Sequence, residues 1–211
     1  MTTNRKPAFW IAALWFALAL PAGAALRQPV TPETKPVQTA DFLAPVPTGE
    51  NWVYLQRNLP GLVSFRKHDP VRATFPGGEY QSFVVEIRAE TLNGEDLLTL
   101  DGLEAALKNW LYRDNEGSYG PLRVESFPWQ ETDCLVFMNS RQLPEEVDGR
   151  RVLFLSASEG FFCRHPLNAR IAIIGYFQER LLAGTPSLLD DALRQEAERI
   201  LQGVRFPPFF K

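Results

Sequence analysis

Cysteine, histidine and methionine are scarce in this chain, which contains two residues of each. The cysteines do not form a Cys-x-x-Cys pair, and this absence disfavours a thiol redox centre. A zinc site would need both cysteines together with His68 and His165, at spacings that match no compact metal motif. We therefore expect the chain to hold no metal and no cofactor.

Positive charge is not in excess either. The chain carries 22 basic and 25 acidic residues, which gives a net charge of -3. Nucleic acids and anionic lipids bind proteins through basic patches, so this balance disfavours both as general partners. The glycine-rich motifs of dinucleotide and phosphate binding are absent, as is the G-x-S-x-G motif of serine hydrolases. No enzyme class is therefore indicated by a local motif.

Residues 1–24 have the pattern of a secretory signal peptide. Arg5 and Lys6 precede an unbroken apolar run from Ala8 to Leu20, and small residues follow it up to Ala24. The run is shorter than the roughly 20 residues that cross a bilayer, so we expect cleavage after Ala24 and export to the periplasm or cell envelope. The alternative is an uncleaved membrane anchor. A lipoprotein is disfavoured because no cysteine directly follows the run.

Residues 25–50 lack the periodicity of a helix or a strand. Five prolines interrupt this segment, namely Pro29, Pro32, Pro36, Pro45 and Pro47. Proline-rich segments favour extended conformations and act as spacers, so we expect a tether here. A single folded domain is then expected over residues 51–211.

The domain begins with a predicted β-hairpin. Trp52–Leu55 and Leu62–Phe65 are strand-like runs that flank the turn signal Asn58–Gly61. A third run, Ser82–Ile87, is rich in β-branched and aromatic residues and is also expected to be a strand. Four further strands are expected nearer the C-terminus, at Leu122–Phe127, Cys134–Ser140, Arg151–Ala157 and Ile171–Phe177. The loop between the second and third of these contains Pro144, Asp148 and Gly149, which indicates a long hairpin.

Two segments have helical periodicity. Leu103–Arg113 places apolar residues on one face, and Asp101 stands where a capping residue is expected. The second helix is expected to begin with Thr185 or Ser187 as its cap and to end at Gly203. Its apolar stripe comprises Leu189, Leu193, Ala197, Ile200 and Leu201.

The elements follow one another as strands, a helix, an antiparallel run of strands and a final helix. This order predicts an α+β fold in which helices flank one antiparallel sheet. The layout resembles that of the PsbP-like α/β/α sandwich domains over Asn51 to Phe206. The resemblance implies a role as a binding or assembly factor, and it transfers no functional residue.

Export places Cys134 and Cys163 where disulfides persist, so we expect them to be bonded to each other. On the chain-entropy model this bond stabilises the fold by roughly 3.5 kcal/mol. The alternative is that Cys163 and His165 act as nucleophile and base. On a strand, however, side chains two residues apart lie about 6–7 Å from each other, which is too far for a direct hydrogen bond.

Aromatic residues in the second half of the chain are candidates for contact with a partner. Trp129 is expected in a strand or at its edge, and it is the tryptophan for which exposure is most favoured. Phe206, Phe209 and Phe210 end the chain together with two prolines. This C-terminal arm either covers a sheet edge or docks on a partner.

We therefore predict an exported, non-catalytic binding or assembly factor of the bacterial-type cell envelope. Its partner is expected to be an envelope protein and not a nucleic acid, and no catalytic residue is assigned. One alternative is an envelope hydrolase or thiol enzyme that uses Cys163 and His165. A second alternative is a membrane-anchored accessory subunit of an envelope complex, which requires the N-terminal segment to remain uncleaved.

Overall fold

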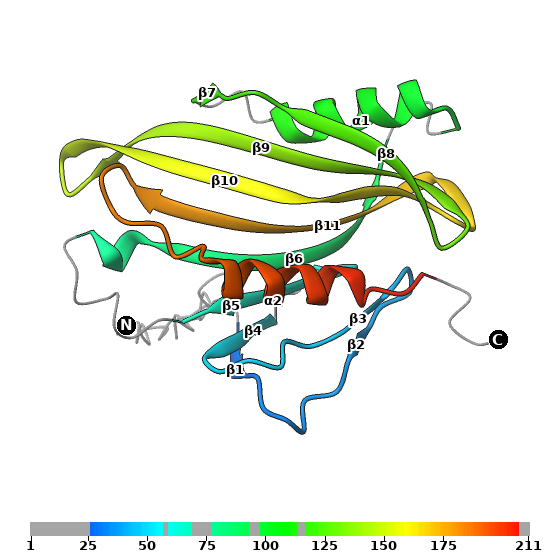
Figure 1. Ribbon diagram of the computed structural model, residues 1–211, viewed down its shortest axis with the longest axis horizontal. Helices are drawn as coiled ribbons and strands as arrows, with labels where there is room; N and C mark the ends of the chain where they lie inside the picture. Colours follow the sequence, from blue (N-terminus) through cyan, green and yellow to red (C-terminus); the bar gives the residue numbers. More distant parts are fainter. Residues whose placement is uncertain (1–25, 57–58, 69–76, 93–97, 114–116, 207–211) are drawn as a thin grey trace, which may run out of the picture.

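The computed structural model describes residues 26–206 apart from 57–58, 69–76, 93–97 and 114–116. One antiparallel sheet of nine strands dominates these residues (Figure 1). Strands account for 53% of them and helices for 17%. The predicted α+β class, a sandwich with flanking helical layers, is therefore wrong. The described chain is mostly β-structure because its strands extend well beyond the apolar runs that predicted them.

The large sheet contains β1 (Leu26–Pro29), β4 (Trp52–Gln56), β5 (Leu62–Lys67), β6 (Ser82–Thr91), β7 (Ser118–Tyr119), β8 (Arg123–Trp129), β9 (Thr132–Val147), β10 (Arg150–His165) and β11 (Asn168–Leu182). Neighbouring strands follow the order β1-β4-β5-β6-β11-β10-β9-β7, and β8 also pairs with β9. The predicted hairpin before residue 68 is confirmed as the antiparallel pair β4 and β5. A short 3-10 helix, η2 (Gly78–Tyr80), precedes β6.

The C-terminal half of the sheet is built from unusually long strands. β9 and β10 each contain 16 residues, and β11 contains 15. β9 and β10 pair up to a tight turn at Asp148 and Gly149, whose φ angles of 50° and 73° suit a type I′ turn. The predicted loop is therefore strand at Pro144 and as far as Val147, because backbone pairing continues where the side chains are polar.

The segment predicted to be a tether packs against the domain instead. Its first residues form β1, which pairs with β4, and β2 (Val37–Gln38) and β3 (Leu43–Ala44) form a small hairpin. Phe42 is fully buried in the main core, and Leu43 exchanges two backbone hydrogen bonds with Arg205 at 2.9 and 3.0 Å. Apolar residues between the prolines thus find partners that are distant in the sequence. The predicted signal peptide lies outside the described residues.

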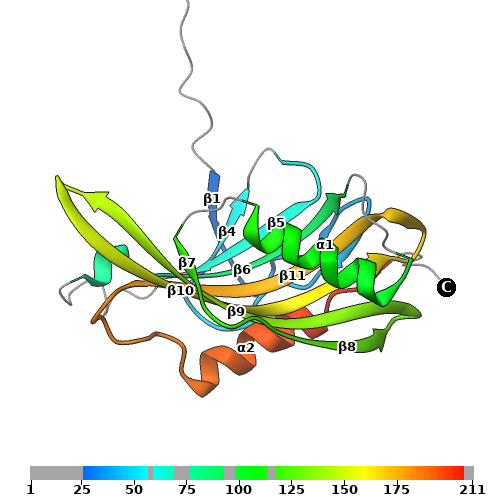
Figure 2. The same ribbon diagram turned by 90° about the horizontal axis from the view of Figure 1, so that it is seen from above.

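The two α-helices lie on opposite faces of the sheet (Figure 2). They are α1 (Leu100–Tyr112) and α2 (Asp191–Gln202). Side chains alternate between the faces of a strand, so Phe161 of β10 belongs to the core under α2 and Phe162 to the core under α1. Within the described part of the chain, no helix has the length and apolar character needed to cross a membrane.

Both helices begin at residues other than the predicted caps. Thr99 caps α1 by accepting a hydrogen bond from a backbone N–H of the first turn at 3.1 Å. Asp190 caps α2 by accepting from Leu193 N at 2.8 Å. Ser187, a predicted cap, instead donates its hydroxyl to Glu179 of β11 at 2.5 Å. The segment before α2 is therefore attached to the sheet.

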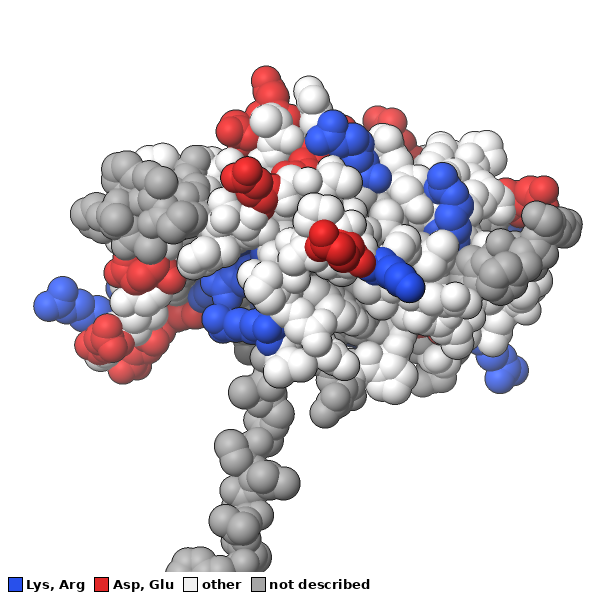
Figure 3. All heavy atoms as spheres, turned by 90° about the horizontal axis from the view of Figure 1, so that it is seen from below, with Lys and Arg blue, Asp and Glu red and all other residues white. Residues whose placement is uncertain are grey.

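Charged side chains are interspersed on the face of the molecule that Figure 3 shows. Lysine and arginine alternate there with aspartate and glutamate among neutral residues. The described residues of that face therefore form no extended basic stripe for a nucleic acid backbone.

Candidate functional site

A polar pocket of about 180 Å³ lies on the α1 face of the sheet. Its floor consists of three pairs of side chains two residues apart on neighbouring strands: Asn139 and Arg141 of β9, Ser156 and Ser158 of β10, and Tyr176 and Gln178 of β11. Because residues two apart share one face of a strand, all six side chains point toward the same side. The last turn of α1 and Tyr119 of β7 complete the wall.

The pocket lining includes residues with buried polar atoms that lack a hydrogen-bond partner among the described residues. Trp110 Nε1, Tyr119 OH and Asn139 Oδ1 are such atoms. Each such atom costs the folded protein about 1–3 kcal/mol, and most buried polar atoms in proteins are paired for this reason. All three atoms belong to residues that line the same pocket.

The floor of the pocket is held by hydrogen bonds that run between strands. Gln178 donates to Ser156 Oγ at 2.6 Å, and Tyr176 donates its hydroxyl to Glu86 of β6 at 2.6 Å. Glu86 also accepts from the Ser64 hydroxyl at 3.0 Å. Burial, followed by the neighbouring Glu86 carboxylate, raises the pKa of Tyr176 far above its usual range. Tyr176 is therefore a fixed, protonated element of the floor.

Aromatic rings form the apolar side of the pocket. The Trp110 ring centroid lies 5.5 Å from that of Tyr176 in an edge-on arrangement. Tyr119 packs edge-on against Tyr112 at 4.5 Å, and the Arg141 guanidinium lies 5.0 Å from the Tyr119 ring centroid. Such contacts hold rings in place, because each ring meets a neighbour of complementary charge distribution.

The charged residues of the described pocket lining are both basic. Its described lining includes Arg113 and Arg141 and contains no aspartate or glutamate. Arg113 pairs with Glu90 at 3.0 Å outside the lining. The described lining also contains no histidine beside Ser156 or Ser158 that would act as their general base. The pocket therefore offers hydrogen-bonding groups and two arginine side chains to a molecule that enters it.

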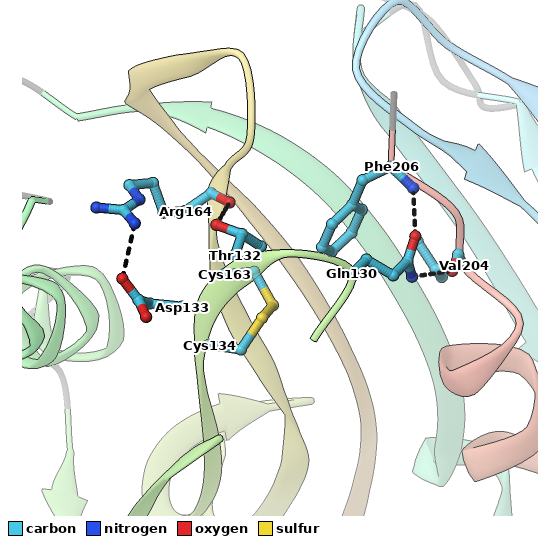
Figure 4. Close-up of a disulfide and its surroundings, with 8 residues drawn as sticks. All are labelled: Gln130, Thr132, Asp133, Cys134, Cys163, Arg164, Val204 and Phe206. Carbon is cyan, nitrogen blue, oxygen red and sulfur yellow. Dashed lines mark hydrogen bonds and ion pairs between the residues drawn. A yellow bond between two sulfur atoms is a disulfide. The ribbon is translucent and has the colours of Figure 1, made fainter. Parts of the chain in front are cut away.

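The predicted cysteine pair lies at one end of the sheet. Cys134 and Cys163 face each other across β9 and β10, are fully buried and form a disulfide (Figure 4). The bond agrees with the pairing expected from the sequence. Next to it, Arg164 of β10 pairs with Asp133 at 2.7 Å and its carbonyl accepts from the Thr132 hydroxyl at 2.9 Å.

The arrangement of Cys163 and His165 does not match a nucleophile and its base. Cys163 has no thiol to activate, because its sulfur is bonded to Cys134. His165 is buried, and its Nδ1 accepts a hydrogen bond from Leu167 N at 3.1 Å. Burial lowers the pKa of His165, although Asp41, 3.8 Å from its Nε2, acts in the opposite direction. Both side chains are therefore engaged in the fold.

The aromatic candidates lie on the α2 face, away from the polar pocket. Trp129 is half-buried, and its ring centroid lies 4.9 Å from Phe161 and 5.1 Å from Phe206. The Gln130 side chain donates to Val204 O at 2.8 Å and accepts from Phe206 N at 2.9 Å (Figure 4). The C-terminal arm thus folds back over the sheet as far as Phe206. Phe209 and Phe210 lie outside the described residues.

An apolar groove of about 320 Å³ runs beside this aromatic cluster, between α2 and the sheet. Phe127 and Trp129 of β8 and Phe177 of β11 contribute to its lining. The Trp129 and Phe206 side chains pack against rings within the chain. Their contact with a partner stays a prediction.

The residues of the polar pocket were not identifiable as a site from the sequence. Asn139, Arg141, Ser156 and Ser158 occupy alternate positions of strands, a pattern that indicates a solvent-facing side. α1 covers part of that side in the folded protein, which turns an ordinary polar face into a partly covered pocket. The only sequence signal is the recurrence of paired polar residues at the same spacing in three neighbouring strands.

A scan of protein-family models and a search of curated proteins found no match to this chain. Its resemblance to the PsbP-like domains therefore remains a prediction from element order.

Proposed function

We propose that this chain is a non-catalytic binding protein of the cell envelope that holds a small ligand in the polar pocket under α1. The observation that carries the proposal is the convergence of Trp110 Nε1, Tyr119 OH and Asn139 Oδ1, all buried and without partners among the described residues, on one pocket. The buried disulfide supports the choice of compartment, because disulfides persist outside the reducing cytoplasm.

The energetic reason for a binding role is the cost of these polar atoms in the empty protein. Apolar side chains at the same positions would remove a penalty of about 1–3 kcal/mol for each atom. Local features that reduce stability are characteristic of functional sites. A ligand that supplies the missing hydrogen bonds recovers this free energy on binding.

The test is a titration of the ¹⁵N-labelled exported protein with a protein-free small-molecule extract of its own envelope fraction. The indole N–H signal of Trp110, assigned with Trp110→Phe, is expected to shift as Nε1 gains an acceptor. Trp52 provides an internal control, because its Nε1 already donates to Glu196 at 2.8 Å. An unchanged Trp110 signal, or equal shifts of both signals, would contradict the proposal.

A variant separates binding from general effects of the extract. Asn139→Leu removes one unpaired polar atom and is close in size to the native residue. We expect this variant to remain folded and to lose the extract-dependent shift of Trp110. Retention of the shift would place the ligand elsewhere.

A further inference from the structure

We propose that the apolar groove between α2 and the sheet binds a small organic cation, an ammonium group that carries short alkyl substituents. The groove lies on the α2 face of the sheet and the polar pocket on the α1 face, so the two sites are separate. This inference goes beyond the proposed function and does not depend on it. Three features of the described residues support it: the aromatic lining, the access from solvent and the charge of the polar side chains.

Four of the described lining residues of the groove are aromatic. Phe127 and Trp129 come from β8, Phe161 from β10 and Phe177 from β11. The rings of Phe127 and Trp129 are stacked with centroids 6.2 Å apart, and Trp129 meets Phe161 edge-on at 4.9 Å. The face of an aromatic ring carries partial negative charge, so a cation within about 6 Å of its centroid is attracted. The rings therefore favour a cation over a neutral molecule of the same shape.

Part of this lining is open to solvent. Val136 of β9 is 42% exposed, and Phe127 and Trp129 are half-buried. Phe161 and Phe177 are buried and form the floor. A ligand therefore meets the rings of Phe127 and Trp129 first.

The polar side chains of the lining carry negative charge or none. They are Glu159, Glu198 and Gln202, and no described lining residue is basic. Arg194 of α2 pairs with Glu159 and offsets one of the two carboxylates. Glu198 is partly buried, and its side chain has no ion pair or hydrogen bond among the described residues. One carboxylate thus remains without a counter-charge, and a ligand with a single positive charge matches it.

The fold already holds a cation against this aromatic wall. The Arg194 guanidinium lies 5.8 Å from the Phe177 ring centroid while it pairs with Glu159. This part of the α2 face therefore accommodates a positive charge beside both a ring and a carboxylate. Trp129 and Glu198, both partly exposed, offer the same two kinds of group to a ligand.

The size and apolar character of the groove favour an alkylated ammonium over a bare one. A volume of about 320 Å³ suits a small molecule. A bare ammonium is strongly hydrated and costly to transfer to an apolar surface, whereas alkyl groups on the nitrogen reduce that hydration. A phosphate close to the nitrogen would meet Glu159 and Glu198 with like charge. We therefore expect a free cation and not a phosphocholine headgroup.

The experiment compares choline with phosphocholine and with dimethylbutanol, a neutral compound of the same shape in which carbon replaces the nitrogen of choline. Binding to the exported protein is measured by calorimetry and by the indole N–H signal of Trp129, assigned with Trp129→Phe. We expect choline to bind about tenfold more tightly than either other compound, and its affinity to fall with added salt. The signal of Trp52, which is fully buried, should remain unchanged.

Variants separate the carboxylate from the ring. Glu198→Gln is expected to weaken choline binding several-fold and to leave dimethylbutanol binding unchanged. Trp129→Leu removes a ring and should lower the preference for choline. Glu104→Gln, on α1 at the opposite face of the sheet, is the matched control and should leave both affinities unchanged. The comparison of choline with dimethylbutanol on the unmodified protein stays decisive even if the Trp129 variant fails to fold.

The other outcomes identify a different occupant of the groove. Equal binding of dimethylbutanol overturns the cation and indicates a neutral apolar ligand. Tighter binding of phosphocholine overturns the free cation in favour of a headgroup. A Trp129 signal that shifts with protein concentration alone shows that a second copy covers the groove, and failure of choline to shift Trp129 overturns the inference outright. The proposed function is judged by the Trp110 signal and so stands or fails separately.

Discussion

At the scale of single residues, buried polar groups differ in the number of hydrogen-bond partners that the described residues give them. Glu86 accepts from two hydroxyl groups, and Glu179 accepts from Gln81, Ser187 and Leu188 N. These carboxylates are satisfied and hold elements together. Trp110 Nε1 and its two neighbours in the polar pocket have no such partners among the described residues. The contrast separates groups whose hydrogen bonds are made within the fold from groups whose partners, in our proposal, a ligand supplies.

Substitution of Asn139 tests this distinction through stability. Asn139→Leu is expected to raise the free energy of unfolding of the empty protein by about 1 kcal/mol, because it removes an unpaired buried polar atom. Urea unfolding provides the measurement. Ser64→Ala is the matched control and should lower stability by a similar amount, because Ser64 donates to Glu86. A loss of stability in Asn139→Leu would show that this amide serves the fold.

His165 makes stability depend on pH. Its pKa is lowered by burial, so the unfolded chain binds a proton more readily than the folded protein. Stability should therefore fall as the pH drops through the unfolded-state value of about 6.5 and level off below the folded-state value. Denaturant unfolding at a series of pH values measures this effect.

His165→Asn is the control for this pH dependence. Its side-chain oxygen can replace Nδ1 as the acceptor for Leu167 N, and it does not titrate. The variant is expected to lose the part of the pH dependence below about pH 6.5 that belongs to His165. An unchanged profile would assign the effect to other groups.

At the scale of elements, single side chains attach segments that have little regular structure. Glu196 of α2 accepts from Gly49 N and Trp52 Nε1, both at 2.8 Å, and pairs with Lys67 at 3.1 Å. Gln130 attaches the C-terminal arm in the same way from the turn between β8 and β9. These contacts explain how a proline-rich segment and a chain end become part of the domain.

Removal of the Glu196 carboxylate should loosen the N-terminal segment. Glu196→Ala leaves two donors and one cation without their acceptor, and we expect a loss of about 3 kcal/mol in the free energy of unfolding. Glu196→Gln retains an acceptor oxygen and should lose less. Limited proteolysis within residues 26–50 should accelerate in Glu196→Ala. Equal stability of all three proteins would contradict this role.

At the scale of the whole molecule, one end of the sheet gathers segments that are far apart in the sequence. The disulfide joins β9 to β10, the turn before β9 holds the C-terminal arm, and β3 pairs with the same arm at Arg205. Segments around Leu43, the disulfide and Arg205 thus meet there. A covalent bond at this point restrains β9 and β10 directly and their neighbours through packing.

Intact-mass spectrometry tests the processing and the redox state of the whole chain. For protein purified from its native envelope, we expect a mass that corresponds to a start at Ala25. Both cysteines should react with an alkylating reagent only after reduction and unfolding, because they are bonded and fully buried. A mass that includes Met1 would favour the anchored subunit. Alkylation of Cys163 without reduction would revive the thiol enzyme.

Local sequence patterns located most of the regular elements. The run at Ser82–Ile87 lies within β6, and the apolar stripe of the last helix is buried at Leu193, Ala197 and Ile200, because period and propensity act over a few neighbouring residues. The ends of β9 and β10 were missed. Their polar residues pair through the backbone, which leaves no side-chain pattern to detect.

Thus the sequence by itself determined the amphipathic helices, the cores of the strands and the pair of cysteines available for bonding. Only the tertiary structure decided that Phe42 enters the core and that Asn139 and Tyr119 share a pocket with Trp110. The physical reason is that the two kinds of feature depend on interactions over different distances along the sequence. Side-chain periodicity is a local property, whereas burial of a polar strand face depends on where a distant helix packs.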